Sequence, residues 1–492
     1  MMSRKLIAAM LAVVMSLTLV PAFAQTTQYD YTLTITVDNF MPEVPPADSA
    51  SMKYLEEMTQ TDIDCNWVPS NDYMTKVNAM IAAGTLTKVV VVTDIKNANI
   101  VKATRAGLFW ELTDYIAKGD FPSLQSMNEI VVNNIKIDGK LFALPRNLEL
   151  PFHAITYRSD WLANLGLEKP TTLDELYEVI RAFTLNDPDG NGMDDTYGLA
   201  MNGSNNLAPE QIQLILGGPN YWEVTADGKF VPFFAHESYK PTLNWIKRLY
   251  DEGLVNPDFA SITEQQMKEM IEASKAGVSI QHIAQITERV PVLRGINPAY
   301  DMDYTVIDDG NGVRLFPSSG VSGIYMIPKS SVPTEEELMR ILTFFERLAR
   351  KEIQTFMQWG VPGIHSDVNK DGKLEMIDPS GYNAEVNVLR RLKPHTLVDS
   401  DVGVAAPEME KRNTFYATME QYCVGNPAMA FISETNLKMG VELNQLLDDA
   451  ATQYIMGAIN EDQLDAIHQQ WYDEGGAKII AEYEAALAQS KK

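Results

Sequence analysis

Acidic and amide side chains alternate along one short loop with a spacing that suits a hard cation. Side-chain oxygens fall at loop positions one, three, five and nine, a glycine stands at position six, and the carbonyl at position seven would add a ligand. Calcium is held by oxygen ligands at this spacing. The sequence therefore predicts a structural calcium site formed by Asp187, Asp189, Asn191, Met193 and Asp195.

The loop also allows an interpretation without metal. Position twelve is Gly198 instead of the usual bidentate glutamate, and an Asx-rich surface turn could close on its own backbone. Three carboxylates held this close repel unless positive charge lies between them, which favours calcium. A second loop, residues 367–378, has an acidic residue at position twelve, but its Asn-Lys-Asp-Gly run and Pro379 favour a hairpin. Whether this second loop binds calcium stays open.

Motifs for covalent chemistry are absent from the sequence. There is no Gly-x-Ser-x-Gly, no His-Glu-x-x-His and no phosphate-binding glycine-rich loop, and the 6 histidines are scattered singly. Paired carboxylates for glycoside hydrolysis are assembled in space, so the many acidic residues leave that chemistry open. We therefore expect a protein that is not an enzyme.

Tryptophans are candidate ligand-binding residues, because a flat aromatic ring can cover the apolar face of a cyclic ligand. Trp67, Trp222 and Trp359 fall in expected loops at the ends of strands or helices, whereas Trp161 and Trp471 lie on apolar helical faces and are expected in the core. For each loop tryptophan, packing across a seam between lobes is the alternative to ligand binding.

The N-terminus predicts export. Two cations, Arg4 and Lys5, precede an apolar run and an Ala-Phe-Ala cleavage pattern, which indicates a signal peptide over residues 1–24. Its removal would change the formal net charge from −26 to −28. Such a charge disfavours nucleic acid as a partner and makes a neutral ligand more expected than a polyanion, unless a local basic cleft overrides the mean.

Alternating short strands and helices must position these residues. Residues 31–37 and 89–92 are predicted strands, and residues 52–59 and 73–83 are predicted helices. Thr172 and Glu175 form a predicted capping box at the start of an amphipathic helix that leads into the first loop. Predicted strands at 154–157, 277–280 and 323–327 and a helical C-terminal region complete an α/β pattern.

Several phrases, in this order, resemble the extracellular solute-binding proteins of carbohydrate ABC transporters, notably the long lipoprotein-type members that include alginate-binding proteins with a calcium loop. They are Asp138-Gly-Lys-Leu-Phe-Ala-Leu-Pro, Arg158-Ser-Asp-Trp-Leu-Ala-Asn-Leu-Gly-Leu, Pro170-Thr-Thr-Leu-Asp-Glu-Leu-Tyr, the run from Asp187, Gly217-Gly-Pro-Asn-Tyr-Trp and Gly360-Val-Pro-Gly-Ile-His. The resemblance implies an α/β fold of the type II periplasmic-binding-protein-like class, with two α/β lobes joined by a multi-strand hinge. Lobe 1 would comprise residues 25–153 and 324–400, and lobe 2 residues 154–323 and 401–492.

The resemblance also implies where a ligand binds. Arg146, Asn147 and Glu149 fall where the family's chain passes between lobes beside the ligand cleft, and aromatic residues near the three loop tryptophans border that cleft. The alternative for Arg146 and Glu149 is a mutual surface ion pair.

The expected function follows from the resemblance. An extracellular binding protein would capture a sugar, an oligosaccharide or another small solute between its lobes and deliver it, as a monomer, to ABC transporter permease subunits. The alternatives are a secreted glycan-active enzyme and a calcium-dependent surface glycan-binding protein. Ala24 and Gln25 stand where lipidated members carry a cysteine, so the chain is expected to be secreted or cell-surface associated, or periplasmic in a Gram-negative organism.

Overall fold

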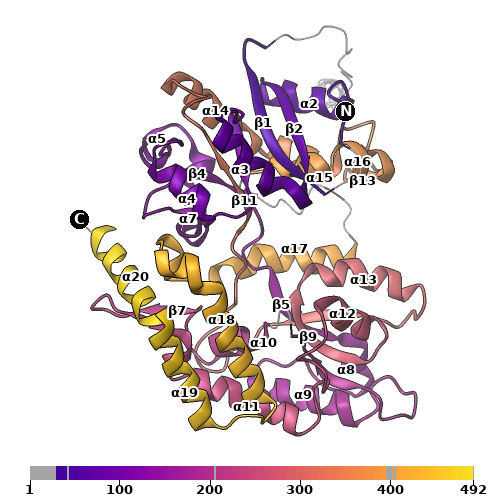
Figure 1. Cartoon of the computed structure of the whole chain (residues 1–492). Coiled ribbons are helices and arrows are strands. Elements are labelled where there is room, and N and C mark those ends of the chain that lie inside the picture. The colour runs from indigo at the N-terminus through magenta and orange to yellow at the C-terminus, as the bar shows by residue number, and fades with distance from the viewer. Residues whose placement is uncertain (1–28, 41–43, 204–206, 395–402, 404–405, 491–492) are drawn as a thin grey trace, which may run out of the picture.

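The computed structural model describes residues 29–40, 44–203, 207–394, 403 and 406–490, so the predicted signal peptide lies outside the described residues. Figure 1 shows two α/β lobes, one containing the N-terminal strands and the other the C-terminal helices, with a narrow connection between them.

Lobe 1 is built on a five-stranded sheet of order β2-β1-β3-β11-β4. The first three strands pair in parallel, and β11 runs antiparallel to both of its neighbours. The strands are β1 (Thr32–Asn39), β2 (Asp62–Pro69), β3 (Val89–Val92), β4 (Ala143–Asn147) and β11 (Val321–Met326). The four valines of β3 are fully buried, as expected for a central strand covered on both faces.

Helices cover this sheet and complete the hydrophobic core of lobe 1. They are α2 (Ala50–Thr59), α3 (Tyr73–Ala83), α4 (Ala98–Arg105), α5 (Thr113–Lys118), α6 (Pro122–Gln125), α7 (Glu129–Ile135), α14 (Glu335–Leu348), α15 (Lys351–Trp359) and α16 (Pro379–Glu385). A small hairpin of β12 (Ser366–Val368) and β13 (Leu374–Met376) lies beside α15, followed after α16 by a 3₁₀ turn, η3 (Val388–Leu392).

Lobe 2 has a four-stranded sheet of order β10-β5-β9-β6, in which β6 and β9 are parallel and β5 runs antiparallel to β9 and β10. Its strands are β5 (His153–Arg158), β6 (Tyr197–Ala200), β9 (Ala276–His282) and β10 (Met302–Thr305), with a separate hairpin of β7 (Trp222–Val224) and β8 (Phe230–Pro232).

Ten helices of the described chain belong to lobe 2. They are α8 (Ser159–Asn164), α9 (Leu173–Leu185), α10 (Ala208–Ile215), α11 (Tyr239–Asp251), α12 (Glu264–Glu272), α13 (Ala284–Arg294), α17 (Pro407–Met419), α18 (Glu434–Ile455), α19 (Glu461–Trp471) and α20 (Ala477–Ser490). The last three run along one side of the lobe (Figure 1) and bury Trp471 and Tyr483 in its core.

Local sequence signals correspond closely to the observed elements. The capping box is confirmed, because Thr172 accepts a hydrogen bond from the Glu175 N–H and the Glu175 side chain returns to the backbone of Thr172. The predicted hairpin at 367–378 is confirmed as β12 and β13. The three tryptophans were expected in loops at strand or helix ends, and none lies in a loop: Trp67 lies inside edge strand β2, Trp222 begins β7 and Trp359 ends α15. Within the described residues, no helix is long and apolar enough to span a membrane.

Candidate functional site

Two described chain segments cross between the lobes side by side: the first joins β4 to β5, and the second leads into β11. The third crossing connects η3 to α17, and the structure describes its residues 393, 394, 403 and 406. Backbone hydrogen bonds tie the first two crossings together, with Leu148 N–H donating to Gly320 O at 3.1 Å and Ser318 N–H to Leu150 O at 2.9 Å. We call the surface between the lobes along these crossings the seam.

A row of rings follows the first two crossings. Phe152 stacks on His282 with centroids 3.6 Å apart and meets His153 edge-on at 5.1 Å. His153 lies 6.3 Å from Phe316, which in turn lies 5.8 Å from Tyr221. Burial lowers the pKa of both histidines to about 4, so they present neutral rings near pH 7. The row is therefore largely uncharged; Tyr221 is exposed, Phe152, His153 and His282 are half-buried, and Phe316 is buried.

The row ends at a pair of cavities in lobe 2. One has a volume of about 220 Å³ and is lined by Phe316, Tyr221 and Glu210, and the other, of about 260 Å³, also contacts Tyr221 and reaches Lys96 of lobe 1. Tyr221 is 40% exposed and holds a backbone φ of +58°, which is uncommon for a side chain of its size. Strained backbone at a cavity mouth is a common property of binding sites.

Glu210 is the acidic group of the first cavity. The Tyr221 hydroxyl donates to its Oε1 at 3.4 Å, and its Oε2 is shielded from solvent without a hydrogen-bond partner in the described chain. Burial raises the pKa of Glu210 to about 7, and the nearby Asp448 carboxylate contributes to the rise. This end of the seam is therefore acidic or neutral.

Cations gather at the other end of the seam. The guanidinium of Arg391 lies 4.4 Å from the ring centroid of Phe40, which follows β1 and is 65% exposed. On α17, the Arg412 guanidinium lies 5.9 Å from the Tyr416 ring, whose hydroxyl is 3.3 Å from His282 Nε2. These contacts place charged groups of both lobes beside the ring row.

Of the three predicted polar residues, Arg146 and Asn147 stabilise the fold, and Glu149 lies at the seam. Arg146 is only 2% exposed and forms an ion pair with Asp38, and its Nε donates to Ser322 Oγ at 3.1 Å. Asn147 ends β4, where its N–H donates to Lys393 O at 3.4 Å. Glu149 is half-buried in the first crossing, where its carboxylate tends to raise the pKa of both Lys393 and Tyr416.

The rings of the three predicted tryptophans all pack against other parts of the protein. Trp67 packs against the lobe 1 core, and Trp222 packs edge-on to Tyr483 at 5.4 Å while lining the second cavity. Trp359 is 8% exposed and is covered by the third crossing, because a Cβ at Gly403 would lie 1.9 Å from its ring. Of the three, only Trp222 borders a cavity of the seam.

The structure adds residues that the sequence interpretation did not select. These are Phe40, Tyr221, Arg391, Arg412 and Tyr416. Tyr221 directly precedes Trp222, so a search for paired aromatic residues could have found it. Arg412 and Tyr416 are four residues apart on α17, a spacing that makes them neighbours on the helix surface, whereas Phe40 and Arg391 lie far from them along the chain.

The predicted calcium loop is closed by its own hydrogen bonds. Asp187 accepts from the N–H groups of Asn191 at 3.0 Å and Gly192 at 2.9 Å, and Lys275 pairs with Asp195. In the described parts of the chain no group of three or more His, Cys, Asp or Glu side chains is arranged to hold a metal ion. The donors are nevertheless the hard oxygens that calcium prefers, and burial and neighbouring carboxylates raise the pKa of Asp189.

Two α/β lobes, three crossings and a ring-lined seam define a two-lobed binding protein of the type II class. Solved structures share this fold: a human-milk-oligosaccharide-binding protein of Bifidobacterium longum infantis has a TM-score of 0.67 at 16% identity, covering 93% of this chain and 98% of that one. The fructooligosaccharide-binding protein FusA of Streptococcus pneumoniae, solved with kestose, has a TM-score of 0.61 at 18% identity over 94% and 99% of the two chains.

Sequence comparisons identify the family. The bacterial extracellular solute-binding protein profile matches residues 40–355. The polygalacturonan/rhamnogalacturonan-binding protein YtcQ of Bacillus subtilis is 36% identical over 91% of this chain and 89% of its own length, and the lipoprotein LipO of the same organism is 32% identical over 94% and 93%. The chain belongs to the bacterial extracellular solute-binding protein family.

Proposed function

We propose that the protein captures an oligosaccharide in the seam and delivers it to the permease of an ABC transporter. The observation that carries the proposal is the row of rings from Phe152 to Tyr221, which ends at two cavities of lobe 2, one of which reaches Lys96 of lobe 1. Aromatic rings suit the apolar faces of sugar units. The names of YtcQ and FusA, which describe polygalacturonan/rhamnogalacturonan and fructooligosaccharide binding, support an oligosaccharide ligand.

The mechanism is capture by closure. A sugar on the ring row contacts the crossings and lobe 2 in any state, whereas lobe 1 groups such as Phe40 add contacts only when the lobes approach. Because a ligand stabilises the state with which it makes more favourable contacts, the bound sugar shifts the population toward the closed form. The permease would then receive the closed form.

The test is a thermal-shift screen of the mature protein against neutral and acidic oligosaccharides, with product analysis of every hit. A saccharide at about a hundred times its Kd adds about 2.7 kcal/mol of stability. Recovery of the intact sugar supports capture, whereas cleavage would favour the alternative of a glycan-active enzyme. Tyr221→Ala should weaken the hit about tenfold, while Tyr115→Ala, on α5 away from the seam, should not.

Location and partners form part of the same proposal. Export through the segment 1–24 and action as a monomer outside the cytoplasm fit the family, although LipO is named a lipoprotein and this chain has Gln25 in place of a lipidated cysteine. N-terminal sequencing of the exported protein should begin at Gln25. Copurification with permease subunits would distinguish transport from surface glycan binding alone.

We also propose that the loop from Asp187 to Asp195 holds calcium. Solved structures titled as an EF-hand mutant of FusA and as the alginate-binding protein AlgQ2 without calcium ion show that such sites occur in proteins of this fold. Binding would replace Lys275 as the positive charge beside Asp195. Calcium should raise the melting temperature of the EDTA-treated protein. Asp187→Asn should abolish that rise, whereas Asp371→Asn, in the β12–β13 turn, should not.

A further inference from the structure

Among the described residues, positive charge at one end of the seam exceeds the negative charge around it. Five cations lie there: Arg146, Arg390, Arg391, Lys393 and Arg412. Their electrostatic neighbours include three carboxylates, Asp38, Glu149 and Glu288. The excess is unexpected in a chain with 66 acidic and 40 basic residues.

The excess consists of cations that lack a carboxylate partner among the described residues, although Arg412 donates to Asn413 and Arg390 hydrogen-bonds the Tyr382 side chain. Asp38 is shared by Arg146 and Arg391, whose guanidinium lies 3.5 Å from it. Within the described residues, Arg390, Lys393 and Arg412 have no carboxylate within ion-pair distance. Burial, followed by repulsion from Arg390, lowers the pKa of Lys393 to about 8. Close like charges are unfavourable unless an anion lies between them, so this arrangement suits a ligand that supplies one.

The cations lie on both sides of the seam. Arg390, Arg391 and Lys393 belong to η3 and the start of the third crossing, and Arg412 lies on α17. Arg412 lies 5.9 Å from the Tyr416 ring centroid. Burial raises the pKa of the Tyr416 hydroxyl and both Arg412 and Arg390 act to lower it, so both cations lie near that residue.

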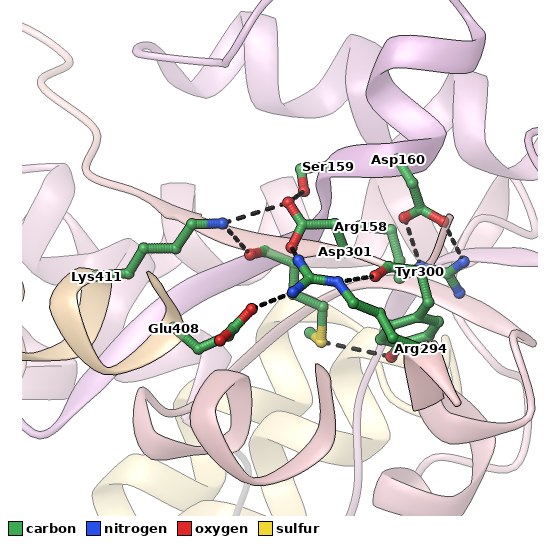
Figure 2. Close-up of polar contacts among 9 residues, drawn as sticks. Arg158, Ser159, Asp160, Arg294, Tyr300, Asp301, Glu408 and Lys411 are labelled. Atoms are coloured by element: carbon green, nitrogen blue, oxygen red, sulfur yellow. Dashed lines mark hydrogen bonds and ion pairs between the residues drawn. The ribbon is translucent and has the colours of Figure 1, made fainter. Parts of the chain in front are cut away.

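Ion pairs fasten α17 to lobe 2. Figure 2 shows Glu408 paired with Arg294, and Lys411 reaching Asp301 at 3.3 Å and the carbonyl of Met302 at 2.9 Å. Arg412 therefore moves with lobe 2, whereas Arg391 stays with lobe 1 through Asp38. An anion that contacts both would draw the lobes together.

Aromatic rings accompany the cations. Phe40 is 65% exposed beside Arg391, and Tyr416 lies beside Arg412. A uronic acid presents an apolar ring face and a carboxylate on the same unit, which matches a ring next to a guanidinium. Guanidinium groups bind carboxylates through two parallel hydrogen bonds, which makes arginine better suited than lysine to this task.

Resting on the proposed capture function, we propose that the ligand is an anionic oligosaccharide of uronic acid units, whose carboxylates bind Arg390, Arg391 and Arg412. Glu210 and Asp448 line the cavity at the opposite end, so the ligand lies with its carboxylates toward the cations and an uncharged part toward Tyr221. The local charge of the seam, and not the mean charge of the chain, selects the ligand.

The experiment is calorimetric titration of the full mature protein with trigalacturonate and with its methyl ester, which has the same sugar rings without the charges. The acid should bind at least about tenfold more tightly, and its affinity should fall at least about tenfold between 50 and 500 mM NaCl. Arg390→Gln and Arg412→Gln should each weaken acid binding about tenfold and leave ester binding within about twofold. Lys118→Gln, which removes an exposed cation on α5, should change neither.

The outcomes separate this inference from the proposed function. Equal affinity for acid and ester, or tight binding of neutral oligosaccharides alone, would overturn the uronate inference and leave sugar capture intact. Absence of binding by any oligosaccharide would overturn both. Melting curves of the two variants without ligand should match the parent, which shows that weaker binding does not come from unfolding.

Discussion

Two charged regions meet on the same helix, α17, and they differ in how their charges are balanced. Glu408 and Lys411 join Arg294 and Asp301 in the cluster of Figure 2, which with Arg158 and Asp160 holds three cations and three carboxylates. Arg412, the residue after Lys411, donates to the Asn413 side chain and enters the seam without a carboxylate partner in the described chain.

The difference separates charges that serve the fold from charges available to a ligand. In the balanced cluster Arg158 is 1% exposed, and its guanidinium lies 4.1 Å from the Tyr300 ring centroid and pairs with Asp160 at 2.6 Å. A buried charge is costly unless an opposite charge compensates it, whereas an exposed charge is solvated by water and stays available to bind a ligand. Four substitutions test the comparison.

The largest loss of unfolding free energy is expected on substituting Arg146, the seam cation that is fully paired. Arg146→Met would leave Asp38 buried with only the more distant Arg391, and breaking a buried pair costs about 3–5 kcal/mol. Urea unfolding followed by circular dichroism measures the loss. The double variant Asp38→Leu with Arg146→Met should recover much of it, and a single variant as stable as the parent would contradict the buried pair.

The next effect is expected in the balanced cluster. Arg294→Gln would strand Glu408, whose side chain is 4% exposed, and leave Lys411 as the partner of Asp301. Because Arg294 itself is 39% exposed, we expect a loss of roughly 2–3 kcal/mol, near the lower limit for buried pairs. As the control, Arg340→Gln on α14 removes an exposed pair with Glu336 and should change stability by less than about 0.5 kcal/mol.

Local patterns predicted much of the fold because their causes are local. The capping box at Thr172, the all-valine strand from Val89 and the Asn369 turn each depend on a few neighbouring residues. Strand β2 was missed although Ile63, Cys65 and Trp67 alternate with Asp62, Asp64 and Asn66, the period of a half-buried strand; Asp and Asn have low strand propensity, and β2 forms at the sheet edge by pairing with β1. Tertiary pairing, not local propensity, determines such a strand.

The seam was predicted less well because it is assembled from distant segments. The position of the polar trio at a crossing followed from family resemblance, yet pairing with Asp38, 108 residues away, makes Arg146 a structural residue. The expectation of a neutral ligand used the mean charge, which says nothing about where charges gather. Phe40 and Arg391 become neighbours only through the fold.

Glu210 gives a smaller, pH-dependent effect at the acidic end of the seam. Its folded pKa of about 7 exceeds its usual value of 4.5, so between these values the folded state holds more protons than the unfolded state. Stability from this group is thus present below about 4.5 and is lost as the pH rises through about 7. After allowing for solvent screening of this partly exposed residue, we expect Glu210→Gln to raise the unfolding free energy by about 1–2 kcal/mol at pH 8 and by almost nothing at pH 4. Equal gains at both pH values in urea unfolding would contradict the raised pKa.

Arg412→Gln should have the smallest effect on the free protein, which is what distinguishes it from Arg294→Gln on the same part of the molecule. Arg412 has no carboxylate to strand and lies near other cations, so we expect the unfolding free energy to stay within about 0.5 kcal/mol of the parent, or to rise. With saturating trigalacturonate, the Arg412→Gln variant should instead be less stable than the parent, because a tenfold weaker Kd removes about 1.4 kcal/mol of ligand-induced stability. Paired melting curves with and without the ligand therefore assign each cation of α17 to the fold or to the ligand.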